Sequence, residues 1–179
     1  MVLGPNSAGM SHALPLLVGG SIAIDNVKTP EDEATNLLGG SASYASLAAS
    51  YFTDPVHLVG VIGSDYPPEH LAMLERHGVS LKGVDRSDGA SFTWSGEDHQ
   101  KMNDRTTHNV AVNVLESWRV NLPQELSGSP VVVLANMAPV NQLEMLDQCN
   151  AVERFVLADT MDLWIGIARE ELEKVLTRI

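Results

Sequence analysis

Three short segments combine glycine with polar residues in a pattern that suits the binding of a hydroxylated ligand. The first runs from Gly19 to Asp25, directly after the apolar run Leu16–Val18. A carboxylate here can accept hydrogen bonds from vicinal hydroxyls, and ligands of open α/β folds bind at the carboxyl ends of parallel strands. Taken alone, this segment is more typical of a glycine turn followed by a solvated aspartate.

The second segment is Gly39–Tyr44, a glycine pair that leads into a stretch rich in alanine and serine. Glycines let a backbone approach a ligand closely, and the start of a helix presents free N–H groups. The pair is equally compatible with a tight turn that packs a helix closely on a sheet. The third segment, Gly60–Asp65, is better explained by a structural role in which Asp65 caps the following helix.

These segments lie between apolar runs that predict alternating strands and helices. The predicted strands are Leu16–Val18, Val56–Ile62, Val131–Leu134 and Phe155–Leu157. The predicted helices are Ser41–Phe52, Pro67–His77, Gln142–Cys149 and Arg169–Ile179. We expect Thr29–Asn36 to be an exposed turn and Val79–Val84 to be a short extended link. The alternation predicts an α/β fold with a parallel sheet covered by helices.

Two further strand pairs, at about residues 22–38 and 91–114, do not fit this alternation. We interpret them as a small separate sheet, the lid, which covers a cleft. Residues 1–13 have no periodicity and are predicted to be a disordered leader, so the partial α/β domain spans residues 14–179. Because Ile179 lies on the apolar face of the last predicted helix, we expect the domain to be truncated at its carboxyl end.

Composition excludes several classes of partner. The net charge of -12 disfavours nucleic acid and anionic membrane surfaces. The apolar run Leu14–Val18 is too short to span a bilayer, and no Lys or Arg precedes Lys28 as in a signal peptide. The one cysteine cannot form an internal disulfide, and the six histidines lack the spacing of metal ligands. A cytoplasmic location fits these features.

The order and spacing of the three glycine segments resemble the first half of the ribokinase-like (PfkB) family of carbohydrate kinases. Three later stretches fit the same pattern, namely Met102–Thr107, Leu134–Pro139 and Asp159–Trp164. The resemblance covers about Leu16 to Ile179. It implies a three-layer α/β/α fold with a parallel sheet and a small β-sheet lid. It also implies ATP-dependent phosphorylation of a sugar or nucleoside hydroxyl by the full-length parent.

The resemblance implies a substrate site formed by Asp25, Gly39, Gly40, Tyr44, Arg105 and Asn136. Asp25 would accept hydrogen bonds from sugar hydroxyls, and the two glycines would approach the sugar through their backbone. Asn136 would line the pocket, and Arg105 would reach the substrate from the lid. Tyr44 stands where many family members carry Asn, and Asn136 stands where some carry an acidic residue, so the acceptor stays open between several sugars and nucleosides.

The chain lacks the catalytic motif of the resembled family. That motif, G-A-G-D, supplies backbone N–H groups for the transferring phosphate and an aspartate that takes the hydroxyl proton. The family's N-x-x-E motif, linked to Mg²⁺ and phosphate, would follow Ile179. We therefore expect ATP and Mg²⁺ to serve the full-length parent, and this chain to hold neither catalytic nor metal-binding residues and to be inactive alone.

Two alternatives remain open. The chain can be a non-catalytic sugar-binding module or a module that forms a homodimer through edge strands of the lid. A dinucleotide-binding domain of an oxidoreductase is disfavoured because no G-x-G-x-x-G occurs. Asp98 and His99 are predicted to lie solvated in a hairpin loop. The three tryptophans are expected in a core or an interface rather than as ligand platforms, and these are Trp94, Trp118 and Trp164.

Overall fold

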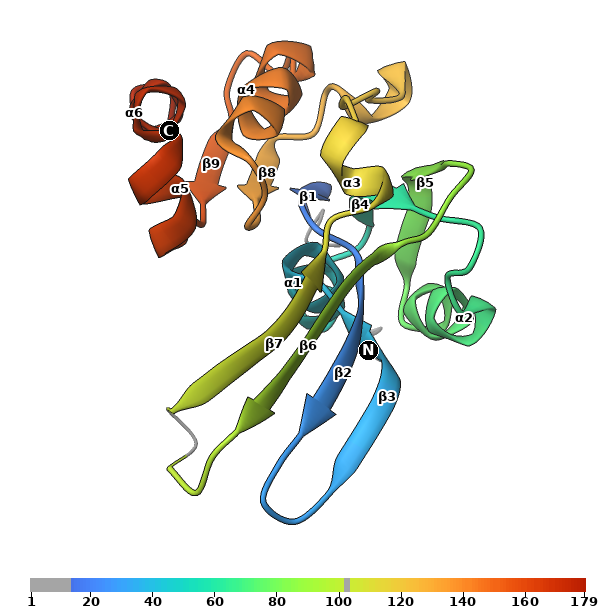
Figure 1. Ribbon diagram of the computed structural model, residues 1–179. Helices are drawn as coiled ribbons and strands as arrows, with labels where there is room; N and C mark the ends of the chain where they lie inside the picture. Colours follow the sequence, from blue (N-terminus) through green and yellow to red (C-terminus); the bar gives the residue numbers. More distant parts are fainter. Residues whose placement is uncertain (1–13, 102–103) are drawn as a thin grey trace, which may run out of the picture.

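A five-stranded parallel sheet forms the larger part of the structure, a computed structural model that describes residues 14–101 and 104–179 (Figure 1). The strand order is β5-β4-β1-β8-β9, with β1 at Leu16–Gly19, β4 at Val56–Ile62, β5 at Val79–Arg86, β8 at Val131–Leu134 and β9 at Phe155–Ala158. Every pair of neighbours is parallel. The predicted leader and the first two residues of Met102–Thr107 lie outside the described residues.

Val79–Val84 is extended as predicted, but it is a strand of the sheet and not a link. These residues begin β5, which pairs with β4 and forms one edge of the sheet. An edge strand has one face partly open to solvent, so its sequence lacks the continuous apolar run of a central parallel strand.

Helices cover both faces of the sheet, as predicted. Leu17 packs into a core with residues of one set of helices, and its neighbour Val18 packs into the core on the opposite face. The first set is α3 at Val114–Ser117, α4 at Pro139–Gln148 and α6 at Arg169–Leu176. The second set is α1 at Ser41–Ala49 and α2 at Pro68–Arg76. Three short helical elements were not predicted, namely α3, α5 at Asp162–Ile167 and a 3-10 turn at Gln124–Leu126.

The predicted lid is a separate four-stranded sheet that projects from the carboxyl edge of the parallel sheet (Figure 1). Its order is β3-β2-β6-β7, with β2 at Ala23–Lys28, β3 at Glu33–Gly39, β6 at Phe92–Asp98 and β7 at Arg105–Ala111. The predicted turn Thr29–Asn36 is too long, because only Thr29–Asp32 turns and Glu33 already pairs with Lys28.

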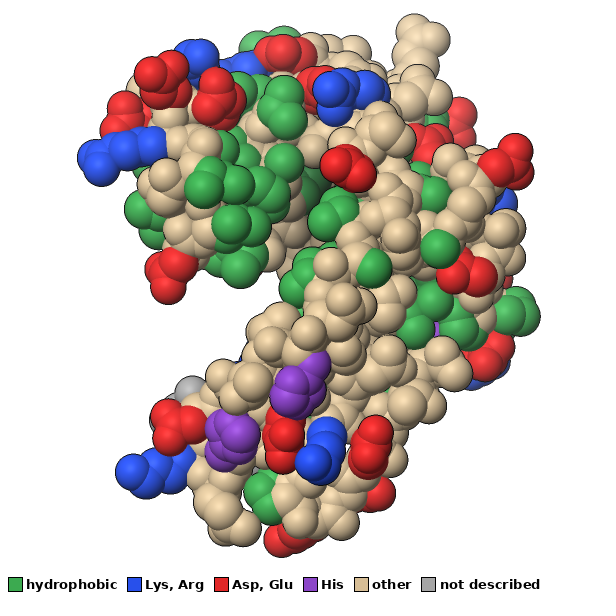
Figure 2. Space-filling view, viewed as in Figure 1, with side chains coloured by type: hydrophobic (Ala, Val, Ile, Leu, Met, Phe, Trp, Pro, Cys, Tyr) green, Lys and Arg blue, Asp and Glu red, His purple; other side chains and the backbone are tan. Residues whose placement is uncertain are grey.

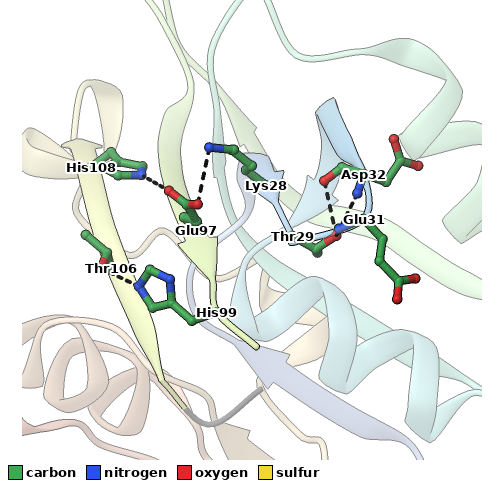
Figure 3. A network of polar contacts seen from close by, with 8 residues as sticks. All are labelled: Lys28, Thr29, Glu31, Asp32, Glu97, His99, Thr106 and His108. Carbon is green, nitrogen blue, oxygen red and sulfur yellow. Dashed lines mark hydrogen bonds and ion pairs between the residues drawn. The ribbon is translucent and has the colours of Figure 1, made fainter. Parts of the chain in front are cut away.

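The outer face of the lid is polar (Figure 3). Glu97 of β6 contacts Lys28 of β2 at 3.2 Å and His108 of β7 at 3.3 Å, and His99 contacts the Thr106 hydroxyl at 2.8 Å. Such exposed pairs contribute little to stability. Because side chains of a strand alternate between faces, the neighbours of these residues point to the inner face.

A cluster of polar contacts around the buried Ser91 fixes the root of the lid. The Asp65 carboxylate accepts hydrogen bonds from the N–H and the hydroxyl of Ser91, both at 2.7 Å, and Ser91 is fully buried. The Ser91 hydroxyl in turn accepts the N–H of Gly63 at 2.9 Å. Asp65 was predicted to cap α2. That prediction is wrong, because Pro67 holds the cap position and no side chain caps the helix.

No helix in the described part of the chain is both long and apolar enough to cross a membrane.

Candidate functional site

A cleft with a volume of about 800 Å³ lies between the carboxyl edge of the parallel sheet and the inner face of the lid. Figure 2 shows the hollow between the larger body and the lid. The sheet side is formed by the loops after β1 and β8 and by the start of α1. Five of the six predicted site residues line this cleft, which are Asp25, Gly40, Tyr44, Arg105 and Asn136.

Gly39, the sixth, lies behind Asp25 instead of on the cleft wall. A Cβ at this position would lie 2.3 Å from both Cγ and Oδ1 of the Asp25 side chain. Gly39 pairs with Ala23 in the antiparallel register of β2 and β3. The Asp25 carboxyl occupies the space that a side chain at position 39 would fill. The glycine therefore makes room for the carboxylate, a contact that the sequence pattern did not predict.

Asp25 is half-buried on the inner face of the lid. Burial raises the pKa of its carboxyl above the ordinary value, and the positive charge of Arg105 partly opposes this shift. A carboxylate held short of full solvation gains more from hydroxyl donors than a solvated one, because its lone pairs are incompletely satisfied.

Gly40 forms the turn between the lid and α1. Its φ of 92° is in the region that favours glycine, and a Cβ there would lie 2.4 Å from the Ser21 carbonyl oxygen. The free N–H groups predicted at this helix start are partly occupied. Ser21 accepts the N–H of Ser41 through its hydroxyl and the N–H of Ala42 through its carbonyl, both at 3.1 Å.

Asn136 lies just after β8 and connects α1 with the segment that follows β9. Its Oδ1 accepts the indole N–H of Trp164 at 3.0 Å, and its Nδ2 donates to the sulfur of Met161 at 3.1 Å. Its backbone carbonyl accepts the Ser41 hydroxyl at 2.9 Å. One N–H and one lone pair of the amide are left for a ligand.

Tyr44 is more than half exposed at the mouth of the cleft. Its hydroxyl donates to the carbonyl of Leu38 at 2.9 Å, so the ring is tied to the end of β3. This hydrogen bond restricts the aromatic ring where it lines the cleft.

The prediction that Asp98 lies solvated in a loop is wrong. Asp98 is the last residue of β6, its side chain is 15% exposed, and its Oδ1 accepts the Nε–H of Arg105 at 2.9 Å. Trp94 and Trp164 line the cleft, whereas Trp118 lies in the core as expected. The signal that could have identified Trp94 and Asp98 is their even spacing in β6, which places them on one face of the strand.

Among residues 14–101 and 104–179, no group of three or more His, Cys, Asp or Glu side chains is placed to hold a metal ion. The described site offers a carboxylate, an amide, a guanidinium and aromatic faces. These groups can bind and orient a hydroxylated ligand with an apolar part.

The site and fold together define an α/β protein whose ligand cleft lies under a β-sheet lid. This is the fold of the ribokinases, and the chain corresponds to part of it. A PfkB protein from Polaromonas sp. JS666 superposes with a TM-score of 0.73 at 14% identity, covering 93% of this chain and 64% of that chain.

Two ligand-bound structures share the fold. Arabidopsis thaliana ribokinase complexed with ribose and ATP has a TM-score of 0.66 at 17% identity, covering 84% of this chain and 55% of that chain. Burkholderia thailandensis nucleoside kinase in complex with inosine has a TM-score of 0.62 at 14% identity, with coverages of 89% and 56%. The chain thus spans between about half and two thirds of these proteins. No protein-family model and no curated protein matches the sequence.

Proposed function

We propose that this chain forms the acceptor-binding part of an ATP-dependent kinase that phosphorylates a hydroxyl group of a sugar or nucleoside. The observation that carries the proposal is the position of Asp25, whose side chain lines the same cleft as the Gly40–Ser41 turn. A carboxylate beside a backbone turn in one cleft suits vicinal hydroxyls, because it accepts two hydrogen bonds while the turn limits the depth of entry.

The ligands of the similar structures support this choice of acceptor. One is described with ribose and ATP and another with inosine, and a structure of Cryptococcus neoformans ribokinase is described with ADP. Ribose and inosine share vicinal hydroxyls on a five-membered ring, which is the group that Asp25 would bind.

The nucleotide and the transferred phosphate need groups that this sequence does not supply. It contains no G-A-G-D segment. We propose that the residues for ATP, Mg²⁺ and the proton transfer belong to a polypeptide segment beyond this sequence, and that the 179-residue chain is inactive alone. Exposed apolar side chains on β9 and α5 support such a neighbour, namely Phe155, Leu157, Ile165 and Ile167.

Calorimetric titration of the chain with ribose and inosine tests the acceptor site. We expect saturable binding of at least one ligand, and a loss of roughly 10-fold or more in Asp25→Asn, because a hydrogen bond to a charged group is worth about 1.5–3 kcal/mol. Asp88→Asn removes one exposed carboxylate outside the cleft and serves as the charge-matched control.

Unchanged affinity of Asp25→Asn would contradict the assignment of the site. Incubation of the chain with ATP, Mg²⁺ and the bound acceptor should yield no phosphorylated product, and a measurable product would contradict the proposed inactivity.

A second candidate is a module that dimerises through the lid. Within the described residues β3 and β7 each pair with one neighbour, and all of β7 except Ala111 is exposed. Such an edge can accept a strand from another copy. Sedimentation at micromolar concentration should then give a dimer, and a strictly monomeric chain would count against this candidate.

A further inference from the structure

The inner face of the lid carries a flat aromatic surface beside Asp25. At the parallel register of β2 and β6, Trp94 lies directly opposite Asp25. Neighbouring strands are about 4.8 Å apart, and paired residues project from the same face of a sheet. The carboxylate and the indole are therefore side by side on the cleft wall.

A glycine determines how the indole lies. A Cβ at Gly96 would lie 2.4 Å from Cη2 and 2.5 Å from Cζ2 of Trp94. The six-membered part of the indole thus covers Gly96, two residues further along the same strand. Any side chain at position 96 would lift the ring, so the glycine permits the indole to lie along the lid instead of standing away from it.

An arginine and an aspartate hold this surface in place. The Arg105 guanidinium carbon lies 5.2 Å from the centre of the Trp94 ring, within the range of a cation–π contact. The Nε–H of the same guanidinium donates to Asp98 at 2.9 Å. The Arg105 side chain is 58% exposed, so its contact with Asp98 is what limits its motion near the Trp94 ring.

We propose that Trp94 and Arg105 form a platform for a planar ring attached to the bound sugar, so that the acceptor is a nucleoside and not a free sugar. This inference rests on the proposed function. A ligand whose vicinal hydroxyls contact Asp25 places its adjacent ring substituent over Trp94. The opposite wall is apolar at Met161 and Leu163, which suits a base better than further hydroxyls.

Calorimetric titration of the 179-residue chain with ribose and inosine tests the inference, because inosine carries a base where ribose carries its anomeric hydroxyl. Stacking of a base on an aromatic side chain predicts that inosine binds roughly 10- to 100-fold more tightly than ribose. In Trp94→Ala the ratio of the two affinities should fall to near one, and in Trp94→Phe it should recover in part.

Two further variants separate the platform from the fold. Gly96→Val keeps the indole but displaces it, so the affinity ratio should also fall. Ser95→Ala changes the opposite face of the same strand and should keep the ratio. Circular dichroism of each variant checks that the chain is folded.

The outcomes are distinct. Equal affinity for ribose and inosine, tighter binding of ribose, or a ratio that survives in folded Trp94→Ala and Gly96→Val would overturn the inference and leave the proposed function intact. Binding of neither ligand by the wild-type chain would overturn both.

Discussion

Gly39→Ala should weaken ligand binding without unfolding the chain. The new Cβ would lie 2.3 Å from the Asp25 carboxyl carbon. Ordinary van der Waals contact begins at 3.4 Å, so the carboxylate must move by about 1 Å. Hydrogen bonds occupy a window of about 2.7–3.2 Å, and a displacement of this size breaks them.

The magnitude follows from the bonds that are lost. One hydrogen bond to a charged group contributes about 1.5–3 kcal/mol, which corresponds to a loss in affinity of roughly 10- to 100-fold. Stability should change little. Glycine inside a strand costs about 0.5–1 kcal/mol relative to alanine, and this gain offsets the adjustment of one flexible side chain.

The assay pairs calorimetric titration with inosine and urea unfolding of the same samples. Gly128→Ala is the matched control, because its Cβ would meet only Asn150 Oδ1 at 3.9 Å, far from any close contact. The double variant Gly39→Ala/Asp25→Asn should bind no more weakly than Asp25→Asn alone, since both changes remove the same interaction. A folded Gly39→Ala with the affinity of the wild type would refute the reasoning.

Four further predictions concern charge and buried polar contacts. Burial raises the pKa of Asp25 and the charge of Arg105 lowers it, so ligand binding should weaken as the pH falls through that pKa. In Arg105→Gln the pKa rises further, and calorimetric titration should show that binding weakens at a higher pH than in the wild type. Because a raised folded-state pKa means that ionisation opposes folding, Asp25→Asn should increase the Tm at pH 7, and the gain should disappear below the unfolded-state pKa. Gln142 is buried and its Nε2 donates to carbonyls at the ends of β8 and β9, so Gln142→Leu should cost about 1–3 kcal/mol in urea unfolding. Asp65→Ala should cost about 1–3 kcal/mol in the same assay, since it removes the acceptor of both the N–H and the hydroxyl of the buried Ser91.

The parallel sheet was predictable because its central strands are continuous apolar runs. Val56–Ile62 and Val131–Leu134 are observed with the predicted bounds. A strand with both faces buried needs apolar side chains at nearly every position, so hydrophobicity alone identifies it. The failures are at edges, where β5 and the start of β3 carry polar residues on an open side. Their strand state depends on pairing with a neighbour, and that contact is not encoded locally.

Part of the cleft lining was predictable for a similar reason. Gly40 and Asn136 follow the ends of β3 and β8, and the carboxyl ends of strands line the ligand crevice of an open α/β sheet. Asp25 lies within β2 and lines the same cleft. Trp94 and Asp98 were missed because their importance depends on the register of two lid strands. A register cannot be read from either strand alone, since a slip of one residue would turn both side chains to the outer face.

Two glycines of the lid each make room for a side chain that lines the cleft. Gly39 makes room for the carboxylate of Asp25, and Gly96 makes room for the indole of Trp94. Glycine weakens a strand interior, so neither position is explained by the stability of the lid. Each glycine lies under a side chain that lines the cleft, and a Cβ at either position would displace that side chain. The same reasoning separates the two halves of the site. On the sheet side, Ser21 and Gly40 contribute backbone contacts. The side chains that the two lid glycines accommodate, Asp25 and Trp94, are those that we propose to select the ligand.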